Sequence, residues 1–295
     1  MFSRLSPYGQ AVIMALAGYF LFSMADTLAK ILSSRHPIAI CLFIPGIIAL
    51  LGISGRIFLQ KGLYGFKTQY LKIHILRSIV ITGLVVLCVN ALKHIPIADF
   101  YSVIFLSPFV VMALSILVYK ESIHLPRILV LILSFIGVII TIGPHFHDMS
   151  IGYLFVGFAV FFSALNVFLV RKIGGKEYPL LYGFFPLMAV TVLSFPFALP
   201  HLSLDVPVTD IWLFLLYGLA LIGAHSLLPT AFARTPSVSK LTPLHYSQMI
   251  WGILAGVFVF DRPLEINTLL GGGLIIFSGL GLFLYELKTS LKKIS

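Results

Sequence analysis

Charged residues are scarce in this sequence: only 10% of its 295 residues are Asp, Glu, Lys or Arg, whereas 59% are hydrophobic. Soluble domains carry roughly 25% charged residues, so a chain this poor in charge cannot form a polar surface that faces water on all sides. Almost no residues remain outside the apolar runs to build a separate soluble domain. The mean hydropathy of +1.07 agrees with a protein that lies almost entirely within a membrane.

The motifs of several enzyme classes are missing as well. The two cysteines, Cys41 and Cys88, lie inside apolar runs and support neither a disulfide nor a metal site. No G-x-x-x-x-G-K-[ST] loop is present, so nothing indicates ATP-driven pumping by this chain alone. Ser-His-Asp, H-E-x-x-H and paired-carboxylate patterns are absent, and His145, His147 and Asp148 form only a weak metal pattern in a predicted loop. We therefore expect no catalytic residue, no metal and no cofactor.

Long apolar runs dominate what is present. A membrane-spanning helix needs about 20 apolar residues, and the sequence contains ten such runs, at residues 10–32, 38–59, 71–93, 97–119, 126–143, 151–170, 179–199, 211–232, 239–260 and 267–287. The first run has the length of a span, and no small-residue cleavage site follows it, so we interpret it as a span and not as a signal peptide. The sequence predicts an all-α membrane protein with ten transmembrane helices.

The second half of the chain repeats the first at an offset of 140 residues. The pairs at this offset include Asp26 with Asn166, Gly83 with Gly223, Ala91 with Ala231, Pro96 with Pro236, and Ser107 with Ser247. One offset held over this length indicates a doubled unit. Five spans per unit is an odd number, so the second unit must enter the membrane from the opposite side. The prediction is two inverted five-helix repeats, residues 1–146 and 147–295, an arrangement common among secondary transporters.

The net charge of +10 reflects topology and gives no reason to expect a nucleic-acid partner. If the predicted loops are assigned alternately to the two faces, the face with both termini collects fifteen basic residues: Arg4, Arg56, Lys61, Lys67, Lys72, Lys120, Arg127, Arg171, Lys172, Lys176, Arg234, Lys240, Lys288, Lys292 and Lys293. The other face holds four: Lys30, Arg35, Lys93 and Arg262. The positive-inside rule then places both termini in the cytoplasm. We expect a multi-pass protein of a bacterial inner membrane, surrounded by lipid and either monomeric or homodimeric.

Two charged residues within predicted spans are candidates for substrate binding, because a charge at membrane depth usually faces a cavity. Asp26 lies about 24 Å along the first span at 1.5 Å per residue, on one helical face with Tyr19, Ser23 and Lys30. It either pairs with Lys30 or binds a substrate group or a proton. Arg77 lies about 9 Å into the third span. It either extends back to the membrane surface or holds an anionic substrate group.

Other polar and aromatic residues extend the predicted substrate site. The polar candidates fall on three spans of the second half at similar depth, and the histidines among them can carry protons: Asn166, His225, His245 and Gln248. The aromatic candidates are predicted cavity walls, although an aromatic residue on a span more often only packs: Tyr101, Phe105, Tyr246 and Trp251. Asn90, where the repeated stretch begins, completes this group.

Proline and glycine mark bends and close helix contacts. Ser107 and Pro108 lie near the middle of the fourth span, and a proline inside a helix removes a backbone hydrogen bond and kinks the helix. In a bilayer such a kink is tolerated where neighbouring helices or cavity water satisfy the freed carbonyl, so Pro108 predicts a functional bend. Pro243 is predicted to open the ninth span. Glycines 271–273, 279 and 281 predict a small-residue face on the tenth span.

These motifs together resemble the drug/metabolite transporter superfamily, EamA type. The residues that carry the resemblance are Leu76-Arg77-Ser78, Ile95-Pro96-Ile97-Ala98-Asp99, Ser107-Pro108, Tyr119-Lys120-Glu121 and Phe135-Ile136-Gly137-Val138. The second half departs from the pattern, with Gln248 in place of the proline and Asp261 in place of the glutamate. Members of this superfamily move amino acids, nucleobases, sugars, riboflavin, S-adenosylmethionine and drugs. The arginine and the Ser-Pro pair are most similar to the S-adenosylmethionine and riboflavin branch.

The resemblance implies a secondary transporter and not an enzyme. We expect it to move a small polar organic metabolite, such as an amino-acid, nucleoside or vitamin-like molecule, by alternating access between its two halves. A membrane-embedded lipid flippase or enzyme built on the same helices is the alternative. Transport of a soluble metabolite without nucleotide would favour the first function, and turnover of a lipid would favour the second.

Overall fold

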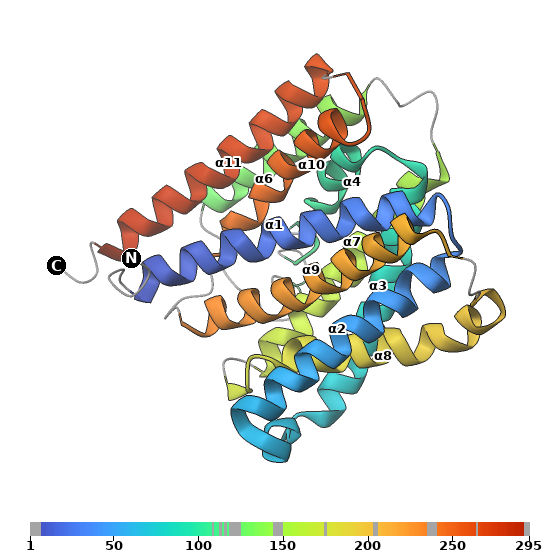
Figure 1. Cartoon of the computed structure of the whole chain (residues 1–295). Helices are drawn as coiled ribbons and strands as arrows, with labels where there is room; N and C mark the ends of the chain where they lie inside the picture. Colours follow the sequence, from blue (N-terminus) through green and yellow to red (C-terminus); the bar gives the residue numbers. More distant parts are fainter. Residues whose placement is uncertain are drawn as a thin grey trace.

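The computed structural model describes residues 7–107, 109–111, 114, 117, 125–143, 150–173, 176–202, 206–234, 241–263 and 265–291. Within these ranges the first half forms α1 (Pro7–Ser33), α2 (Ile38–Lys61), η2 (Gly62–Phe66), α3 (Leu71–His94), α4 (Ile97–Ile104) and α6 (Leu125–Ile142). The second half forms α7 (Ile151–Ile173), α8 (Leu181–Ala198), η5 (Leu199–His201), α9 (Val208–Ala233), η7 (Thr242–Tyr246), α10 (Ser247–Phe258) and α11 (Ile266–Leu291). Figure 1 shows these helices as one bundle.

The predicted all-α fold of two five-helix halves is confirmed, because the described residues contain ten α-helices. Six of these helices, α1, α2, α3, α7, α8 and α9, are long and apolar enough to cross a membrane. Much of the outer surface of the bundle is apolar, as at Leu59, which is 85% exposed, and Phe277, which is 73% exposed. Side chains of this kind are stable against lipid and unfavourable against water. The chain is therefore a multi-pass integral membrane protein.

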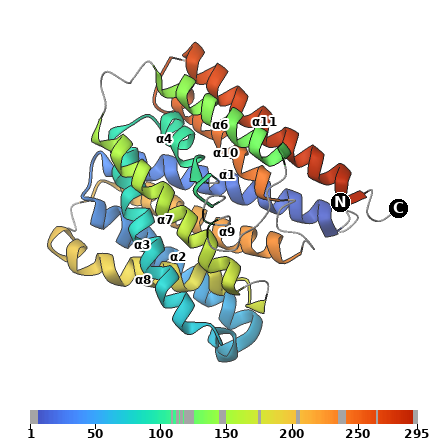
Figure 2. The ribbon, with the colours of Figure 1, turned by 180° about the vertical axis from the view of Figure 1, so that it is seen from behind.

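Helix packing follows a two-fold pattern between the halves. Helix α1 packs along α9, and the equivalent helices α7 and α3 pack along each other. Three further pairs join a helix to its own counterpart: α2 to α8, α4 to α10 and α6 to α11. Figures 1 and 2 show α6, α10 and α11 at one side of the bundle and α2, α3 and α8 at the other. The duplicated sequence thus becomes a duplicated set of helix contacts.

The first helices of the two halves run in opposite directions. At the end of α1, the Lys30 ammonium donates to the carbonyl oxygens of Leu92 and Ile95 at the end of α3, over 2.5 and 2.6 Å. The start of α7 lies at this same face, because the Tyr153 hydroxyl donates to Asp99 at the start of α4 over 2.5 Å. Helix α1 therefore ends where α7 begins, which is the inverted arrangement. The start of α1 and the end of α11 lie together at the opposite face, called here the termini face (Figure 1).

One polar cluster at each face joins the two halves. Away from the termini, Arg35 and His36 of the α1–α2 loop contact the Asp210 carboxylate at the start of α9, over 2.6 and 2.8 Å. We call these three residues the α9 clasp. Because the repeat is inverted, the equivalent contact of the other half joins the α7–α8 loop to the start of α3 at the termini face.

This second cluster, called the α3 clasp, consists of Thr68, His74 and Glu177. The Glu177 carboxylate accepts a hydrogen bond from the Thr68 hydroxyl, and its Oε2 lies 3.3 Å from Nε2 of His74. His74 is fully buried and Glu177 nearly so. Each clasp thus ties a loop of one half to the third helix of the other half, and together they hold the bundle closed at both faces.

The fourth span differs from the continuous run of residues 97–119 that hydropathy indicates. Helix α4 ends at Ile104, and Phe105 and Leu106 form a turn before helical residues resume at Ser107. The break therefore begins before Pro108, and Pro108 itself lies outside the described residues. The ninth span is also interrupted: it opens as the 3-10 helix η7, with Pro243 in its first turn, and continues as α10. Pro243 thus opens this span, as predicted.

The predicted glycine face of α11 is present over part of its length. A Cβ at Gly137 of α6 would lie 2.7 Å from the Gly271 carbonyl oxygen, and a Cβ at Gly272 would lie 2.8 Å from the Met249 side chain. The first contact needs glycine, because the backbone oxygen cannot move away from a Cβ, whereas the flexible end of the Met249 side chain can shift. Gly273 and Gly281 instead face open space. Close packing between α6 and α11 therefore depends on Gly137 and Gly271.

Candidate substrate site between the halves

Asp26 lies where α1 meets α4, and its main partner is a hydroxyl group. The Tyr101 hydroxyl lies 2.7 Å from the Asp26 Oδ2 atom, to which it donates, and 3.0 Å from the Ser23 Oγ atom. Ser23 and Asp26 are three residues apart and share a helix face. Tyr101 and Ser23 are each 1% exposed, while Asp26 keeps partial exposure. A neutral hydroxyl orients the carboxylate without balancing its charge.

Lys30 does not neutralise Asp26, although it follows one helical turn later. Its ammonium is used at the end of α3, where it binds the two carbonyl oxygens of Leu92 and Ile95. Helix ends leave their last carbonyl groups without partners, so Lys30 acts as a cap for α3. Of the two interpretations of Asp26, an ion pair with Lys30 is thereby excluded in this structure. Within the described residues the Asp26 carboxylate has no ion-pair partner.

Aromatic rings extend from Tyr101 across the interface between the halves. Tyr101 stacks on Phe105 at a centroid distance of 5.9 Å, and Phe105 meets His245 edge-on at 5.1 Å and Tyr246 at 5.2 Å. His245 in turn stacks on Tyr19 of α1 at 5.1 Å. These rings come from α1, from the break after α4 and from η7. We call Asp26, Ser23 and this set of rings the central cluster.

The break after α4 and the 3-10 turn η7 position these rings. A continuous helix places residues three or four apart on one face. At both interruptions this spacing is lost, so the aromatic side chains there point in other directions than in a continuous helix. Phe105, in the turn after α4, and Tyr246, at the end of η7, are both largely buried. Equivalent regions of the two repeats thus face each other through aromatic side chains.

Arg77 forms a separate cluster between α3, α7 and α8. Its Nε atom donates to the Asn166 Oδ1 atom over 2.9 Å, and its Nη1 atom donates to the Tyr182 carbonyl oxygen over 2.8 Å. The guanidinium also lies 5.4 Å from the centroid of the Tyr182 ring. Arg77 is only 6% exposed, so it does not extend to the membrane surface. Arg77, from the first half, thus donates to two groups of the second half.

His225 lies between the two clusters. Its ring meets Phe22 of α1 edge-on at 5.1 Å, and a Cβ at Gly183 of α8 would lie 2.9 Å from its own Cβ. It is also within electrostatic range of Arg77. Gln248, three residues after His245, interacts with that histidine. His225 therefore lines the interface between the halves, and Gln248 is buried beside His245.

The remaining predicted residues lie elsewhere. The Asn90 side chain donates to the Val86 carbonyl oxygen of its own helix over 2.8 Å. Trp251 packs edge-on against Phe20, which is 41% exposed on the outer side of α1. Ser107 is buried near the start of the helical segment that follows the break, and the structure does not describe Pro108. Among the described contacts, none joins Asn90, Trp251 or Ser107 to Asp26.

Three residues belong to the two clusters without having been predicted as site residues: Tyr19, Ser23 and Tyr182. The first two share the helical face of Asp26, so their spacing in the sequence was a usable signal. Tyr217 lies within electrostatic range of Asp26, as does Cys88. Tyr182 binds Arg77 through its backbone carbonyl, and a backbone group has no signature in the sequence.

The chemistry of the central cluster suits a positively charged group. A carboxylate without an ion-pair partner attracts a cation or a proton at membrane depth, and the aromatic faces beside it favour a cation through their quadrupoles. Among the described residues no group of three or more His, Cys, Asp or Glu side chains is arranged to hold a metal. The arrangement of an unpaired carboxylate beside aromatic rings is of the kind that suits an organic cation.

Comparison with known proteins identifies relatives over nearly the whole chain. The model of the EamA-like transporter family matches residues 9–143 and again residues 150–284. An S-adenosylmethionine uptake transporter of Rickettsia conorii is 25% identical over 285 residues, which cover 94% of this chain and 95% of that protein. The pseudopaline exporter CntI of Pseudomonas aeruginosa is 22% identical over 273 residues, covering 92% and 95%.

A solved structure shares the fold. A protein crystal structure superposes with a TM-score of 0.66 at 16% sequence identity, covering 92% of this chain and 95% of the other. Likeness at this identity concerns the arrangement of the helices and carries no information on the substrate.

Proposed function

The chain belongs to the EamA-like transporter family, because the family model matches each of its two halves. We propose that it is a secondary transporter of a small polar organic metabolite with a positively charged group. The substrate binds at the central cluster, with its cation against Asp26. The two five-helix halves, residues 1–146 and 147–295, rock against each other and expose this cluster to one face at a time.

The observation that supports this proposal is that the Asp26 carboxylate is hydrogen-bonded to a neutral hydroxyl group and not to a cation. A charge inside the bundle is costly unless it is paired or reaches water, and the partner of Asp26 is the hydroxyl group of Tyr101. Lys30, the nearest cation in sequence, is bound to backbone carbonyls instead. A transported cation would supply the missing charge, and a proton would replace it when the site is empty of substrate.

The relatives narrow the chemistry of the substrate. One relative is named for uptake of S-adenosylmethionine, a molecule with a sulfonium cation, an ammonium group and a carboxylate. Its cation matches Asp26, and its adenine ring can stack on rings such as Phe105 and His245. S-adenosylmethionine is therefore the first probe we would choose, with riboflavin as a neutral aromatic comparison.

The membrane orientation is part of the proposal. The charge asymmetry of the loops favours a bacterial inner membrane with both termini in the cytoplasm. The termini face would then be the cytoplasmic face, and the α9 clasp would lie on the opposite face. A reporter fused to the C-terminus tests this: activity of a periplasmic reporter at that position would overturn the orientation.

Transport by the purified protein tests the function directly. Liposomes containing the full chain should take up radiolabelled S-adenosylmethionine without any nucleotide. Asp26→Asn keeps the size of the side chain and removes its charge. Since hydrogen bonds to charged groups contribute about 1.5–3 kcal/mol, the initial rate at low substrate concentration should fall at least about tenfold.

Asp261→Asn is the matched control, because it makes the same chemical change at an exposed position between α10 and α11. The backbone φ angle there is 48°, a conformation that Asn adopts readily, so uptake should match the unmodified protein. Equal uptake by the Asp26→Asn and unmodified proteins would overturn the role of Asp26. Movement of a labelled phospholipid between leaflets, without uptake of any soluble probe, would favour the flippase alternative.

A further inference from the structure

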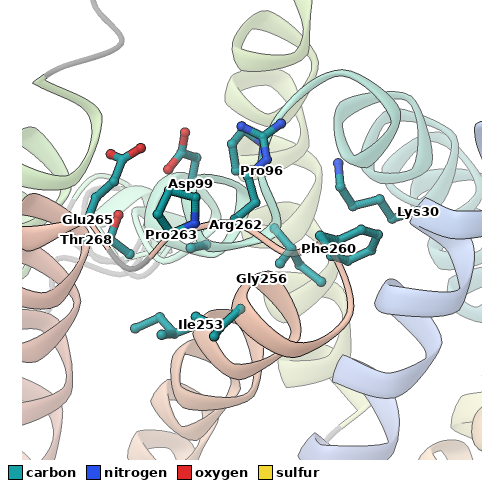
Figure 3. Close-up of a pocket in the computed structure, with 13 residues that line it drawn as sticks. Lys30, Pro96, Asp99, Ile253, Gly256, Phe260, Arg262, Pro263, Glu265 and Thr268 are labelled. Atoms are coloured by element: carbon teal, nitrogen blue, oxygen red, sulfur yellow. The ribbon is translucent and has the colours of Figure 1, made fainter.

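A pocket lies at the face opposite the termini, outside the central cluster. It is formed where the ends of α1 and α10 meet the starts of α4 and α11, so both halves contribute to it (Figure 3). Its walls are mainly apolar, from Ile97, Ile253, Phe260 and Pro263. The charged and polar groups of the pocket come from the residues that flank these walls.

Four charged side chains line the pocket, two of each sign. Figure 3 shows them in a row across its mouth, with the carboxylates of Glu265 and Asp99 at one end and the cationic groups of Arg262 and Lys30 at the other. Arg262 and Asp99 both act electrostatically on Lys30, and Asp99 and Glu265 both act on the hydroxyl of Tyr153. Opposite charges are thus separated along one axis, with apolar surface between them.

Two of the charges are fixed and two lie at the surface. Lys30 is anchored on the end of α3, and Asp99 accepts the Tyr153 hydroxyl while being only 2% exposed. Arg262 and Glu265 are exposed and lie between α10 and α11. The Lys30 ammonium also lies 5.5 Å from the centroid of the Phe260 ring. The fixed pair defines the axis of the pocket, and the exposed pair lies on its solvent side.

The pocket lies directly outside the central cluster. Lys30 follows Asp26 by four residues on the same face of α1, a step of about 6 Å at 1.5 Å per residue. Asp99 precedes Tyr101 by two residues in α4. The pocket thus shares α1 and α4 with the central cluster and lies nearer to the end of α1.

We propose that this pocket is a second binding site for an amino-acid-like zwitterion, a molecule that carries a carboxylate and an ammonium group on a small apolar body. The carboxylate binds toward Arg262 and Lys30, the ammonium binds toward Glu265 and Asp99, and the apolar body lies against Phe260 and Pro263. The proposal rests on the proposed function only in making the pocket a stage on the substrate pathway; the binding of a zwitterion there does not depend on transport.

The test uses L-methionine as the zwitterion, with N-acetyl-L-methionine and L-methionine methyl ester as probes that keep only the anion or only the cation. Binding is measured by equilibrium dialysis on the full chain in lipid nanodiscs. All measurements use the Asp26→Asn background, so that the central cluster offers no carboxylate for the ammonium group. We expect L-methionine to bind more tightly than either blocked probe.

Two single substitutions locate that binding. Arg262→Gln and Glu265→Gln should each weaken L-methionine binding roughly tenfold, as expected for the loss of one hydrogen bond to a charged group. Both positions are exposed, so neither change should prevent folding. Arg262→Lys keeps the charge and should retain most of the affinity, and Asp261→Asn, the neighbouring change of acid to amide, should leave it unchanged.

Three results would overturn the proposal: no L-methionine binding at millimolar concentration, equal binding of the blocked probes, or binding unaffected by both the Arg262→Gln and the Glu265→Gln change. These outcomes are distinguishable from failure of the transport function. Loss of uptake in Asp26→Asn with zwitterion binding intact supports both sites, whereas uptake of S-adenosylmethionine without zwitterion binding supports the central cluster alone.

Discussion

Asp26 and Arg77 each bring one charge into the bundle, but their surroundings differ. Arg77 is bonded to the Asn166 side chain and the Tyr182 carbonyl, and it lies against the Tyr182 ring. Asp26 accepts a hydrogen bond from Tyr101 and keeps partial exposure. Arg77 uses two of its five N–H groups to tie α3 to α7 and α8, whereas the hydrogen bond described for Asp26 comes from a neutral hydroxyl and leaves the charge of the carboxylate unbalanced. We therefore expect Arg77 to act mainly in holding the helices together, and we propose Asp26 as the binding residue.

The two faces of the bundle also differ in how the clasps hold the halves together. The α3 clasp lies near Arg77, so the termini face carries two sets of polar contacts between the halves. The face near Asp26 is held across the halves by the α9 clasp and by the bond from Tyr153 to Asp99. Arg35 of the α9 clasp is itself half exposed, at 51%. His74 and Glu177 of the α3 clasp are buried, so we expect the face near Asp26 to open more easily.

The largest expected effect comes from removing the Arg77 charge. Arg77→Met should lower the free energy of unfolding by about 3 kcal/mol, because it leaves the Asn166 amide oxygen and the Tyr182 carbonyl without donors, each costing about 1–3 kcal/mol when buried. Asp26→Asn should change it by less than about 1 kcal/mol, since the amide oxygen still accepts from Tyr101. Unfolding in a denaturing detergent, followed by circular dichroism, measures both.

Arg77→Lys provides the control, because it keeps the charge but replaces the planar fork of donors with a single ammonium group. Its free energy of unfolding should fall between those of the other two variants. If Asp26→Asn were as destabilising as Arg77→Met, the two charges would have the same structural role and the comparison would fail.

The second prediction examines the partner of Asp26. Tyr101→Phe removes the hydroxyl from Asp26 and Ser23 and keeps the ring against Phe105. We expect KM for the transported substrate to rise about tenfold, in line with one hydrogen bond to a charged group, and the free energy of unfolding to change by about 1 kcal/mol. Uptake kinetics in liposomes provide the first measurement. Tyr153→Phe, which removes the matching hydroxyl from Asp99, is the control and should leave KM for the central cluster within about twofold.

Much of this arrangement could be predicted from the sequence. The ten apolar runs and the offset of 140 residues were sufficient for the two inverted halves, because helix period, span length and duplication all leave their mark on composition. The grouping of Tyr101, Phe105, His245 and Tyr246 near Asp26 was predicted only as a set of separate candidates. Their convergence depends on the break after α4 and on η7, and hydropathy does not distinguish either from a continuous helix.

The partners of the charges were the least predictable part. The sequence offered Lys30 as the partner of Asp26, since four residues separate them on one face. Lys30 binds two backbone carbonyls instead, and every residue has such a carbonyl, so none of them is marked in the sequence. Arg77 and Asn166 were both candidates, but their contact depends on α3 lying along α7, which becomes visible only in the folded bundle.

The third prediction concerns the two clasps. Cys88 lies within electrostatic range of Asp26, and it becomes the single thiol when Cys41 is replaced by Ser. In that background, Asp210→Asn should increase the rate at which a membrane-impermeant thiol reagent labels Cys88 severalfold, because it weakens the α9 clasp. Glu177→Gln should change the rate much less, since Arg77 still joins the halves at the termini face. Faster labelling in Glu177→Gln than in Asp210→Asn would reverse the order proposed for the two faces.

The smallest effect is expected at Asn90, which is a polar residue that we expect not to bind substrate and so contrasts with Asp26. Asn90 is a polar residue at membrane depth, as Asp26 is, but its amide donates to the Val86 carbonyl of its own helix. Thr230, which follows Asn90 by the repeat offset of 140 residues, does the same with the Ser226 carbonyl over 2.6 Å. Both side chains therefore satisfy backbone groups within one helix, and neither needs a ligand.

We expect Asn90→Ala and Thr230→Val each to change uptake by less than about twofold and the free energy of unfolding by about 0.5–1 kcal/mol, the usual value of one neutral hydrogen bond. A tenfold loss of uptake in Asn90→Ala, with folding intact, would place Asn90 in the substrate site and show that a satisfied side chain can still contact the substrate.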